Sequence, residues 1–238
     1  MKTIAVIPAR FNSSRFPGKP LAEIHGKPML WWVYNAVQSS KGISETYVAT
    51  DSSAILDTVI SFGGNAIITG ECACGTDRVA EACRELEFDV VLNIQSDEPM
   101  VRQEFISSLL GAYYDKRVEI ATLRKRISST VEVNDPNIAK VIFDHNEDAI
   151  YFSRCAIPYN KSEKSIVYYK HIGMYAFTRD SLFEFASLPV SNLEIAESLE
   201  QLRAIENGLA IRTVETEFQS IGVDLPEHIA LVENELAL

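Results

Sequence analysis

Short apolar runs alternate with amphipathic segments through the first half of the chain. The segment after Pro28 places Leu30, Val33, Tyr34 and Val37 at helical spacing, and proline is favoured at a helix start. Further segments with helical spacing cover about 55–62, 76–86 and 105–113. The apolar runs have the length of buried strands and lie at 3–7, 46–49, 66–68, 90–94 and 120–123. This alternation predicts an α/β fold with a doubly wound, mainly parallel (Rossmann-like) sheet and right-handed crossovers.

The pattern changes after about residue 124. Strand-like runs are then joined by turn-rich segments without long helices, at 139–143, 149–152 and 172–177. They predict an antiparallel insertion that extends or flanks the main sheet. Helical spacing returns at 181–186 and 194–207, and strand-like runs follow at 211–214 and 221–223. Pro226 opens a last helix that carries Ile229, Val232 and Leu236 on one face.

The chain shows no repeat, low-complexity tract or Gly/Ser-rich linker. Its 238 residues suit one α/β domain with a large core. We therefore predict a single domain over 1–238, with an antiparallel region at about 125–180.

Net charge and composition narrow the function classes. A charge of −11 argues against a general nucleic-acid binder, which needs a basic face, but leaves room for a small anionic ligand. No apolar run is long enough to span a membrane, and residues 1–8 suit a buried first strand better than a signal peptide. The four cysteines show no Cys-x-x-Cys pair for zinc, so we expect free thiols in a reducing cytoplasm.

A cationic loop follows the first predicted strand, over 8–20. It contains Arg10, Arg15 and Lys19 together with small hydroxyl residues, glycine and proline. In a doubly wound sheet ligands bind beyond the carboxyl ends of the strands, and a triphosphate needs cations and backbone N–H donors there. A solvated turn with exposed cations is the alternative. The chain has no Walker A motif and no Gly-x-Gly-x-x-Gly after a strand, which disfavours a P-loop hydrolase and a standard dinucleotide binder.

Two aspartates follow predicted strands and can converge on one point. Asp97 comes after the buried run at 90–94, and Asp224 comes after the run at 221–223. Mg²⁺ prefers oxygen ligands and usually takes one or two carboxylates in addition to phosphate oxygens and water. The alternatives are a turn-forming aspartate before Pro99 and an aspartate near a helix start.

The motifs of this chain resemble those of the sugar-acid cytidylyltransferases, most closely the branch that uses 3-deoxy-manno-octulosonate (Kdo). The first-loop match comprises Pro8-Ala9-Arg10, Ser14-Arg15 and Pro17-Gly18-Lys19-Pro20. Further matches follow in order over almost the whole chain: Ala49-Thr50-Asp51, Gly75-Thr76-Asp77-Arg78, Asn93-Ile94-Gln95-Ser96-Asp97-Glu98-Pro99, Tyr151-Phe152-Ser153-Arg154, Lys170-His171-Ile172-Gly173-Met174-Tyr175, Leu199-Glu200-Gln201-Leu202-Arg203 and Gly222-Val223-Asp224-Leu225-Pro226-Glu227.

The resemblance implies a reaction and a set of roles. CMP is transferred from CTP to the anomeric hydroxyl of an acidic eight-carbon sugar, pyrophosphate leaves, and the product serves lipopolysaccharide biosynthesis. It implies Mg²⁺ on Asp97 and Asp224, and catalytic roles for Arg10, Lys19 and Asp97. It also implies a homodimer, with the antiparallel region at about 125–180 serving sugar binding or dimerisation and part of it forming the interface. The implied nucleotide-binding residues are Pro8, Ala9, Arg10, Ser14, Arg15, Lys19, Gly75, Thr76 and Arg78. The implied sugar-binding residues are Gln95, Arg154, His171, Tyr175, Glu200 and Gln201.

Simpler structural roles are open for several of these residues. Gly75 to Arg78 suits a helix N-terminus with Thr76 as its cap. Glu200 can pair with Arg203 on one helix face, and His171 can be an ordinary structural histidine. Tyr151, Phe152 and Tyr175 can be aromatic residues of the core.

Two positions depart from the pattern of the family, which usually has Gly at the position of Ser96 and commonly Ser at that of Cys74. Both leave open whether the substrate is Kdo, its 8-amino variant or a related sugar acid. A nucleotide-sugar glycosyltransferase is the rival from another enzyme class, and the cationic first loop argues against it. A non-catalytic nucleotide-binding module is the third reading.

Overall fold

The computed structural model describes residues 1–12, 16–162 and 164–236. The chain forms two compact units: unit 1 comprises Met1–Ser107 and Ser220–Leu238, and unit 2 comprises Ser108–Gln219. Unit 2 is thus inserted between the two stretches of unit 1 in the sequence. The expectation of a single domain over 1–238 stays a prediction. Among the described residues no helix is long and apolar enough to cross a membrane.

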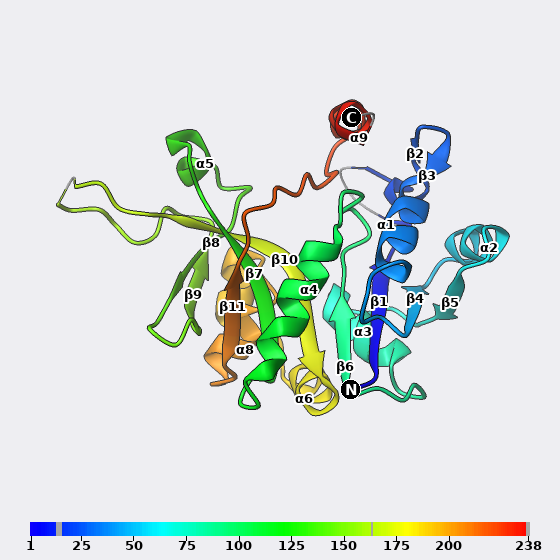
Figure 1. Ribbon diagram of the computed structural model, residues 1–238, viewed down its shortest axis with the longest axis horizontal. Coiled ribbons are helices and arrows are strands. Elements are labelled where there is room, and N and C mark those ends of the chain that lie inside the picture. Colours follow the sequence, from blue (N-terminus) through cyan, green and yellow to red (C-terminus); the bar gives the residue numbers. More distant parts are fainter. Residues whose placement is uncertain (13–15, 163, 237–238) are drawn as a thin grey trace. The chain divides into compact units, whose positions relative to one another are not determined.

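Unit 1 is built on four parallel strands in the order β6 (Val90–Asn93), β1 (Thr3–Ala9), β4 (Glu45–Thr50) and β5 (Asn65–Ile68), as Figure 1 shows. All seven residues of β1 are buried, as their apolar run predicted. The chain runs outward from β1 to β4 and β5, and then returns to the other side of β1 to form β6. The switch point of this parallel sheet lies between β1 and β6, where ligands bind at the carboxyl ends of the strands.

The helices of unit 1 follow the predicted alternation. They are α1 (Met29–Gln38), α2 (Ser53–Ser61), α3 (Gly75–Ala82), the first part of α4 (Gln103–Gly111) and α9 (His228–Leu236). Helix α1 begins directly after Pro28 and buries its predicted apolar face, including Leu30, Val33 and Val37. Helix α2 ends before Gly63, whose φ of +82° allows the sharp turn into β5.

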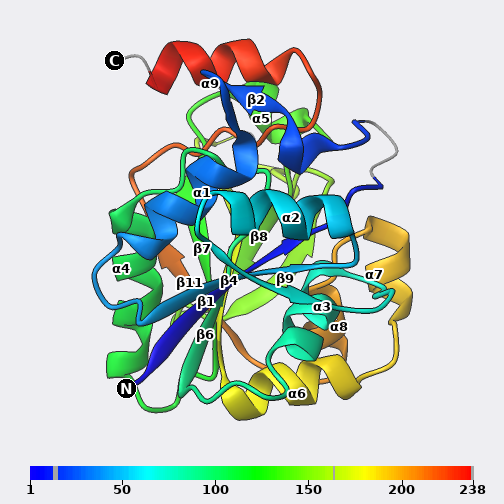
Figure 2. The same ribbon diagram turned by 90° about the vertical axis from the view of Figure 1, so that its right-hand side faces the viewer.

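The last helix of the chain packs on a small hairpin. Strands β2 (Glu23–Ile24) and β3 (Lys27–Pro28) form this hairpin, and α9 lies beside it in both Figure 1 and Figure 2. Val232 of α9 is fully buried in a cluster with Ile24, and Ile229 and Leu236 pack against the same cluster. The apolar face predicted for this helix is therefore confirmed.

The strand predicted at 221–223 is absent from the described structure, so this prediction is wrong. The backbone N–H of Val223 donates to the carbonyl of Asp97 at 2.8 Å, a single bond where a strand would need a ladder. The side chains of Ile221 and Val223 instead join the cluster beneath α9. Their apolar character reflects packing against a helix rather than a place in a sheet.

Unit 2 contains a mixed sheet in the order β11 (Ile211–Glu215), β7 (Ile120–Arg126), β10 (Tyr169–Thr178), β8 (Lys140–Phe143) and β9 (Ala149–Ser153), shown in Figure 1. Strand β11 is parallel to β7, whereas the β7–β10, β10–β8 and β8–β9 pairs are antiparallel. The predicted antiparallel insertion is confirmed. The helices of this unit are α5 (Thr130–Asn134), α6 (Arg179–Ser187), α7 (Asn192–Glu197) and α8 (Leu202–Glu206). A short 3₁₀ turn occurs at Ala112–Tyr114 in unit 2, and another at Lys19–Leu21 in unit 1.

The helix predicted over 194–207 is two short helices, α7 and α8, so this prediction is wrong. Ser198 ends α7 in the left-handed conformation, with φ 51° and ψ 49°. The pair formed by Arg203 and Glu194 requires the break, because residues nine apart on a continuous helix lie about 13.5 Å apart along the axis and on opposite faces. The Arg203 guanidinium contacts the Glu194 carboxylate at 2.9 Å and 2.7 Å.

Candidate functional site

Four predicted site residues, Pro8, Gly75, Thr76 and Gln95, meet where β1 and β6 end. Gln95 donates from Nε2 to Oδ1 of the fully buried Asn93 at 3.2 Å, and Asn93 donates from Nδ2 to Thr76 Oγ1 at 2.9 Å. A Cβ on Gly75 would lie 3.5 Å from the Pro8 ring and 3.6 Å from the Gln95 amide. The end of β1, the start of α3 and the segment after β6 are therefore in close contact. Asn93, which sequence reasoning did not assign, connects them.

The first loop brings a lysine to the two predicted metal ligands. Gly18 has φ +72°, and its N–H donates to the carbonyl of Phe11 at 2.9 Å. Lys19 follows directly, and its Nζ lies 2.6 Å from Asp97 Oδ2 and 3.6 Å from Asp224 Oδ1. The lysine side chain is 12% exposed, and the two carboxylates are 31% and 44% exposed. Two carboxylates thus gather around one cationic group while remaining open to solvent.

The other loop residues are distributed differently. Pro8 and Ala9 are buried at the end of β1, and Arg10 is exposed. Ser14 and Arg15 lie outside the described residues. Their predicted roles in binding the nucleotide therefore remain predictions.

The start of α3 corrects the predicted cap. Cys74, and not Thr76, occupies the N-cap position, and its Sγ accepts from the N–H of Asp77 at 3.4 Å. Thr76 lies inside the helix and is 1% exposed. The resemblance leads us to expect serine at the position of Cys74, and a serine hydroxyl is a favoured N-cap acceptor. The thiol therefore fills the same structural role.

Arg78 is held inside unit 1. Its guanidinium lies 2.7 Å from Asp51 Oδ2, 2.5 Å from Thr69 Oγ1 and 3.3 Å from the carbonyl of Gly70. The residue is 5% exposed. In this structure Arg78 ties α3 to the segments that follow β4 and β5, so any role toward a nucleotide would be added to that structural one. Asp51 belongs to the Ala49-Thr50-Asp51 motif, but its pairing was not predicted.

Glu98 adds a third carboxyl group beside the two aspartates. Burial and the neighbouring Asp97 charge raise the pKa of Glu98 to about 7, and Ser220 donates a hydrogen bond to it. Two positions before Glu98, Ser96 is buried. Positive φ among the described non-glycine residues is confined to His25, Glu147 and Ser198. The serine in place of the usual glycine therefore introduces no backbone strain.

In unit 2, two of the predicted sugar residues, Gln201 and Tyr175, lie beside the ring of a third, His171. Its Nε2 lies 2.8 Å from Thr122 Oγ1, and its Nδ1 lies 3.4 Å from the Gln201 amide nitrogen. The rings of His171 and Tyr175 are 5.4 Å apart. Because the Thr122 hydroxyl can donate to the carbonyl of Met174 at 2.9 Å, it accepts from Nε2–H, and Nδ1 accepts from the amide. This chain of bonds suits a neutral imidazole, and burial lowers the pKa of His171 to about 3.

Arg154 is clamped by backbone carbonyls at the end of β9. Its Nε donates to the carbonyl of Glu197 at 2.7 Å, Nη1 to that of Pro136 at 2.9 Å, and Nη2 to that of Ser198 at 3.3 Å. Within the described part of the chain no carboxylate forms an ion pair with its guanidinium. Glu200 is partly exposed in the break between α7 and α8, and the guanidinium of Arg203 forms a bidentate pair with Glu194.

Comparison with known proteins identifies the family. The sequence profile of the cytidylyltransferases matches residues 4–214. The chain belongs to the cytidylyltransferase family. A 3-deoxy-manno-octulosonate cytidylyltransferase of Thermodesulfovibrio yellowstonii is 46% identical to this cytidylyltransferase over 248 residues, with 98% of the chain and 97% of the relative covered. An 8-amino-3,8-dideoxy-manno-octulosonate cytidylyltransferase of Shewanella pealeana is 44% identical over 244 residues, with all of both chains covered.

A solved structure resembles this cytidylyltransferase over its whole length. It is a CMP:2-keto-3-deoxy-manno-octonic acid synthetase complexed with CTP, with a TM-score of 0.94 and 42% identity. The match covers 100% of this chain and 99% of the other. The fold predicted from the sequence is confirmed by this match.

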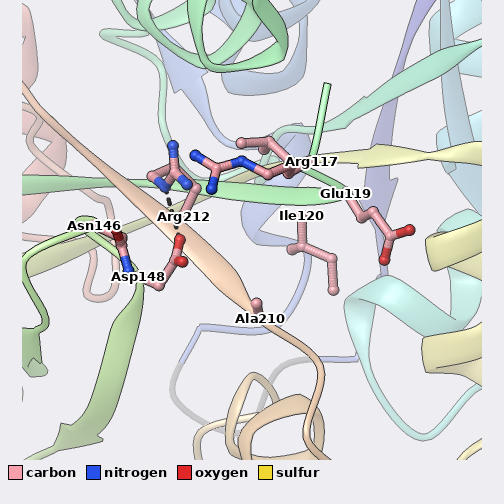
Figure 3. Close-up of a pocket in the computed structure, with 8 residues that line it drawn as sticks. Arg117, Glu119, Ile120, Asn146, Asp148, Ala210 and Arg212 are labelled. Carbon is pink, nitrogen blue, oxygen red and sulfur yellow. Dashed lines mark hydrogen bonds and ion pairs between the residues drawn. The ribbon is translucent and has the colours of Figure 1, made fainter. Parts of the chain in front are cut away.

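A separate cavity of about 220 Å³ lies at the other end of the unit 2 sheet, where β7 and β11 begin (Figure 3). Arg212 points across it toward Asp148, with 2.7 Å between Nε and Oδ1, and its Nη1 lies 3.5 Å from Asp115. Arg117 forms a bidentate pair with the same Asp115. Because both arginines are paired with aspartates, the cavity has no surplus positive charge for an anionic substrate.

The neutral state of His171 predicts a pH dependence of stability in this cytidylyltransferase. Between pH 6.5 and about 3 the unfolded chain binds a proton at this histidine and the folded chain does not, so stability falls as the pH falls through this window. The contribution to the slope is at most about 1.4 kcal/mol per pH unit. We expect His171→Gln to flatten the dependence of the unfolding free energy on pH between 6 and 4.

Urea unfolding at several pH values measures this slope. His145→Gln removes a histidine from an exposed turn and serves as the matched control. An unchanged slope in His171→Gln would show that His171 is not held neutral.

Proposed function

We propose that this enzyme transfers CMP from CTP to the anomeric hydroxyl of Kdo, forming CMP-Kdo and releasing pyrophosphate, for use in lipopolysaccharide biosynthesis. The observation that carries the proposal is the full-length match with a CTP-bound CMP:2-keto-3-deoxy-manno-octonic acid synthetase. The 46% identical relative named for Kdo supports the same sugar. Membership of the cytidylyltransferase family favours this reaction over the glycosyltransferase and binding-module alternatives.

The reaction is an in-line displacement at the α-phosphorus of CTP. The anomeric oxygen forms the new bond to phosphorus and loses its proton, while the bond to the bridging oxygen of the β-phosphate breaks and pyrophosphate leaves. Such chemistry depends on positioning and on offsetting the negative charge of the phosphate oxygens. In this proposal Lys19 and Arg10 bind the triphosphate, and Arg154 binds the carboxylate of the sugar through its planar fork.

We further propose that Mg²⁺ is the cofactor. Asp97 and Asp224 suit it because both offer carboxylate oxygens, which Mg²⁺ prefers. The two carboxylates lie around the Lys19 ammonium, close to the switch point between β1 and β6. The described residues contain no group of three or more His, Cys, Asp or Glu side chains arranged for a metal, and Mg²⁺ commonly uses only one or two carboxylates. Held there, the ion would neutralise charge on phosphate oxygens and lower the pKa of the attacking hydroxyl.

Two further properties are proposed with this function. A homodimer is supported by large apolar side chains exposed in the region predicted for the interface, among them Tyr159 at 86% and Val131 at 78% exposure. A cytoplasmic location is supported by the four cysteines, all of them free thiols.

The decisive experiment supplies the protein with CTP, Mg²⁺ and Kdo and follows pyrophosphate release and CMP-Kdo formation. Parallel reactions use 8-amino-Kdo, sialic acid and the other nucleoside triphosphates. The 44% identical relative named for the 8-amino sugar makes that sugar the second candidate. Faster turnover of 8-amino-Kdo would move the assignment to it, and failure with every sugar acid would refute the proposal.

Lys19→Ala tests the phosphate role of the lysine. We expect turnover to fall by about 10²–10³-fold and the KM for CTP to rise, because a charge that offsets the triphosphate is lost. Steady-state kinetics with CTP varied at saturating Kdo measure both effects. Lys41→Ala, at an exposed position after α1, is the control. An unchanged rate and CTP response in Lys19→Ala would rule out the phosphate role.

A further inference from the structure

Lys140 is a fully buried lysine whose charge is matched by no carboxylate within hydrogen-bond distance among the described residues. It lies on β8 at 0% exposure. Its Nζ donates to the carbonyls of Asp135 at 2.9 Å, Ile138 at 2.5 Å and Arg154 at 2.6 Å. All three ammonium protons therefore have an acceptor, and all three acceptors are backbone atoms. A buried charge held in this way fixes the path of the main chain around it.

Two of the three contacts act on the segment that also holds the Arg154 side chain. The carbonyls of Asp135 and Ile138 flank Pro136, whose own carbonyl accepts from Arg154 Nη1 at 2.9 Å. The third contact holds the carbonyl of Arg154 itself. Lys140 thus fixes the backbone of Arg154 and the backbone group that orients its guanidinium at the same time.

The remaining bonds of Arg154 come from the end of α7. The Glu197 carboxylate accepts from the backbone N–H of Arg154 at 2.9 Å, and the carbonyls of Glu197 and Ser198 accept from its side chain. These bonds use one N–H on each guanidinium nitrogen. Among the described residues one N–H on Nη1 and one on Nη2 have no acceptor, and two N–H groups of this kind can bind a carboxylate bidentately.

We propose that Lys140 is a positioning residue for substrate recognition. By holding the 135–138 turn and the backbone of Arg154, it presents the arginine fork, which pairs with no carboxylate of the described residues, to the carboxylate of the sugar. The inference rests on the proposed function, because it assigns that carboxylate to Arg154. Lys140 itself does not touch the substrate. Its effect is transmitted entirely through the placement of Arg154.

Lys140→Met tests the inference, because methionine keeps the length of the side chain and removes the three donors. We expect the KM for Kdo to rise at least about 10-fold at saturating CTP and Mg²⁺, while the KM for CTP stays within about two-fold of the wild type. Lys125→Met is the matched control in the same unit, because Lys125 donates to the carbonyl of Glu217 and not to the 135–138 turn or Arg154. The control should leave both KM values unchanged.

A double-mutant cycle with Arg154→Ala separates positioning from general destabilisation. If Lys140 acts through Arg154, adding Lys140→Met to Arg154→Ala changes kcat/KM for Kdo by less than about two-fold. Effects that multiply independently would overturn the proposal, as would a folded Lys140→Met protein with an unchanged KM for Kdo. If Lys140→Met does not fold, Lys140→Arg decides: its planar fork keeps the charge but cannot reproduce the three contacts. A KM for Kdo raised at least about three-fold supports the proposal, and a KM within two-fold overturns it.

These outcomes are distinct from failure of the proposed function. If the wild-type protein forms no CMP-sugar from any sugar acid, the function itself is wrong. If the wild type is active and Lys140→Met behaves as the wild type, only the positioning role is wrong.

Discussion

Asp97→Asn is expected to lower the turnover of CMP transfer by about 10³-fold or more while leaving the fold intact. The substitution keeps the size of the side chain but removes the charge that faces Lys19 at 2.6 Å and that is proposed to bind Mg²⁺. The carboxylate is 31% exposed, so its loss leaves no large cavity. Pyrophosphate release under saturating CTP, Mg²⁺ and Kdo measures the rate, and circular dichroism checks the fold.

Asp57→Asn, on the exposed face of α2, is the control for the loss of one carboxylate from the same unit. We expect it to retain the wild-type rate. Near-normal turnover in Asp97→Asn would remove Asp97 from the metal site, whereas a loss in both variants would point to a general effect of charge.

Arg203→Met should have the largest effect on stability, a loss of about 3–5 kcal/mol in the free energy of unfolding. Arg203 is 2% exposed, and its guanidinium makes a bidentate pair with Glu194 and lies 4.8 Å from the centre of the Phe185 ring. Its removal leaves the Glu194 carboxylate, itself only 11% exposed, without its partner. Urea unfolding gives the value, and measuring activity at low temperature separates stability from catalysis.

Arg117→Met supplies the comparison at the surface. Arg117 also pairs bidentately with a carboxylate, that of Asp115, but its side chain is 79% exposed. Exposed pairs contribute at most about 1 kcal/mol, so the two substitutions should differ clearly. A loss below about 1 kcal/mol in Arg203→Met would show that this buried pair contributes no more to stability than an exposed one.

The parallel sheet could be predicted because its strands are buried on both faces and appear as continuous apolar runs. The same reasoning failed at 221–223, where apolar residues pack beneath α9 and form no ladder. It failed again at 194–207, because the helical spacing continues through Ser198. The folded chain instead turns there in the left-handed conformation and brings Arg203 to Glu194. The spacing of apolar residues indicates that a segment is buried, but it does not indicate which helix or strand the segment packs against.

The candidate site shows the same limit. Lys19, Asp97 and Asp224 were predicted from motifs and are brought together in the structure. Thr122 and Lys140 were missed, because a single threonine or lysine on a strand carries no signal until its partners are known. Their partners are a histidine on another strand and three backbone carbonyls, which no spacing rule connects.

The insertion of unit 2 has a consequence for synthesis on the ribosome. Ser220 and Glu98 are hydrogen-bonded although 122 positions separate them in the chain, and Asp224 reaches Lys19 from the same late segment. The strands of unit 1 emerge early from the ribosome. Asp224 and helix α9, which packs on the β2–β3 hairpin, emerge last. A nascent chain therefore has the loop that carries Lys19 long before it has both Asp97 and Asp224. Closing this long loop is an entropic step that only the completed chain can take.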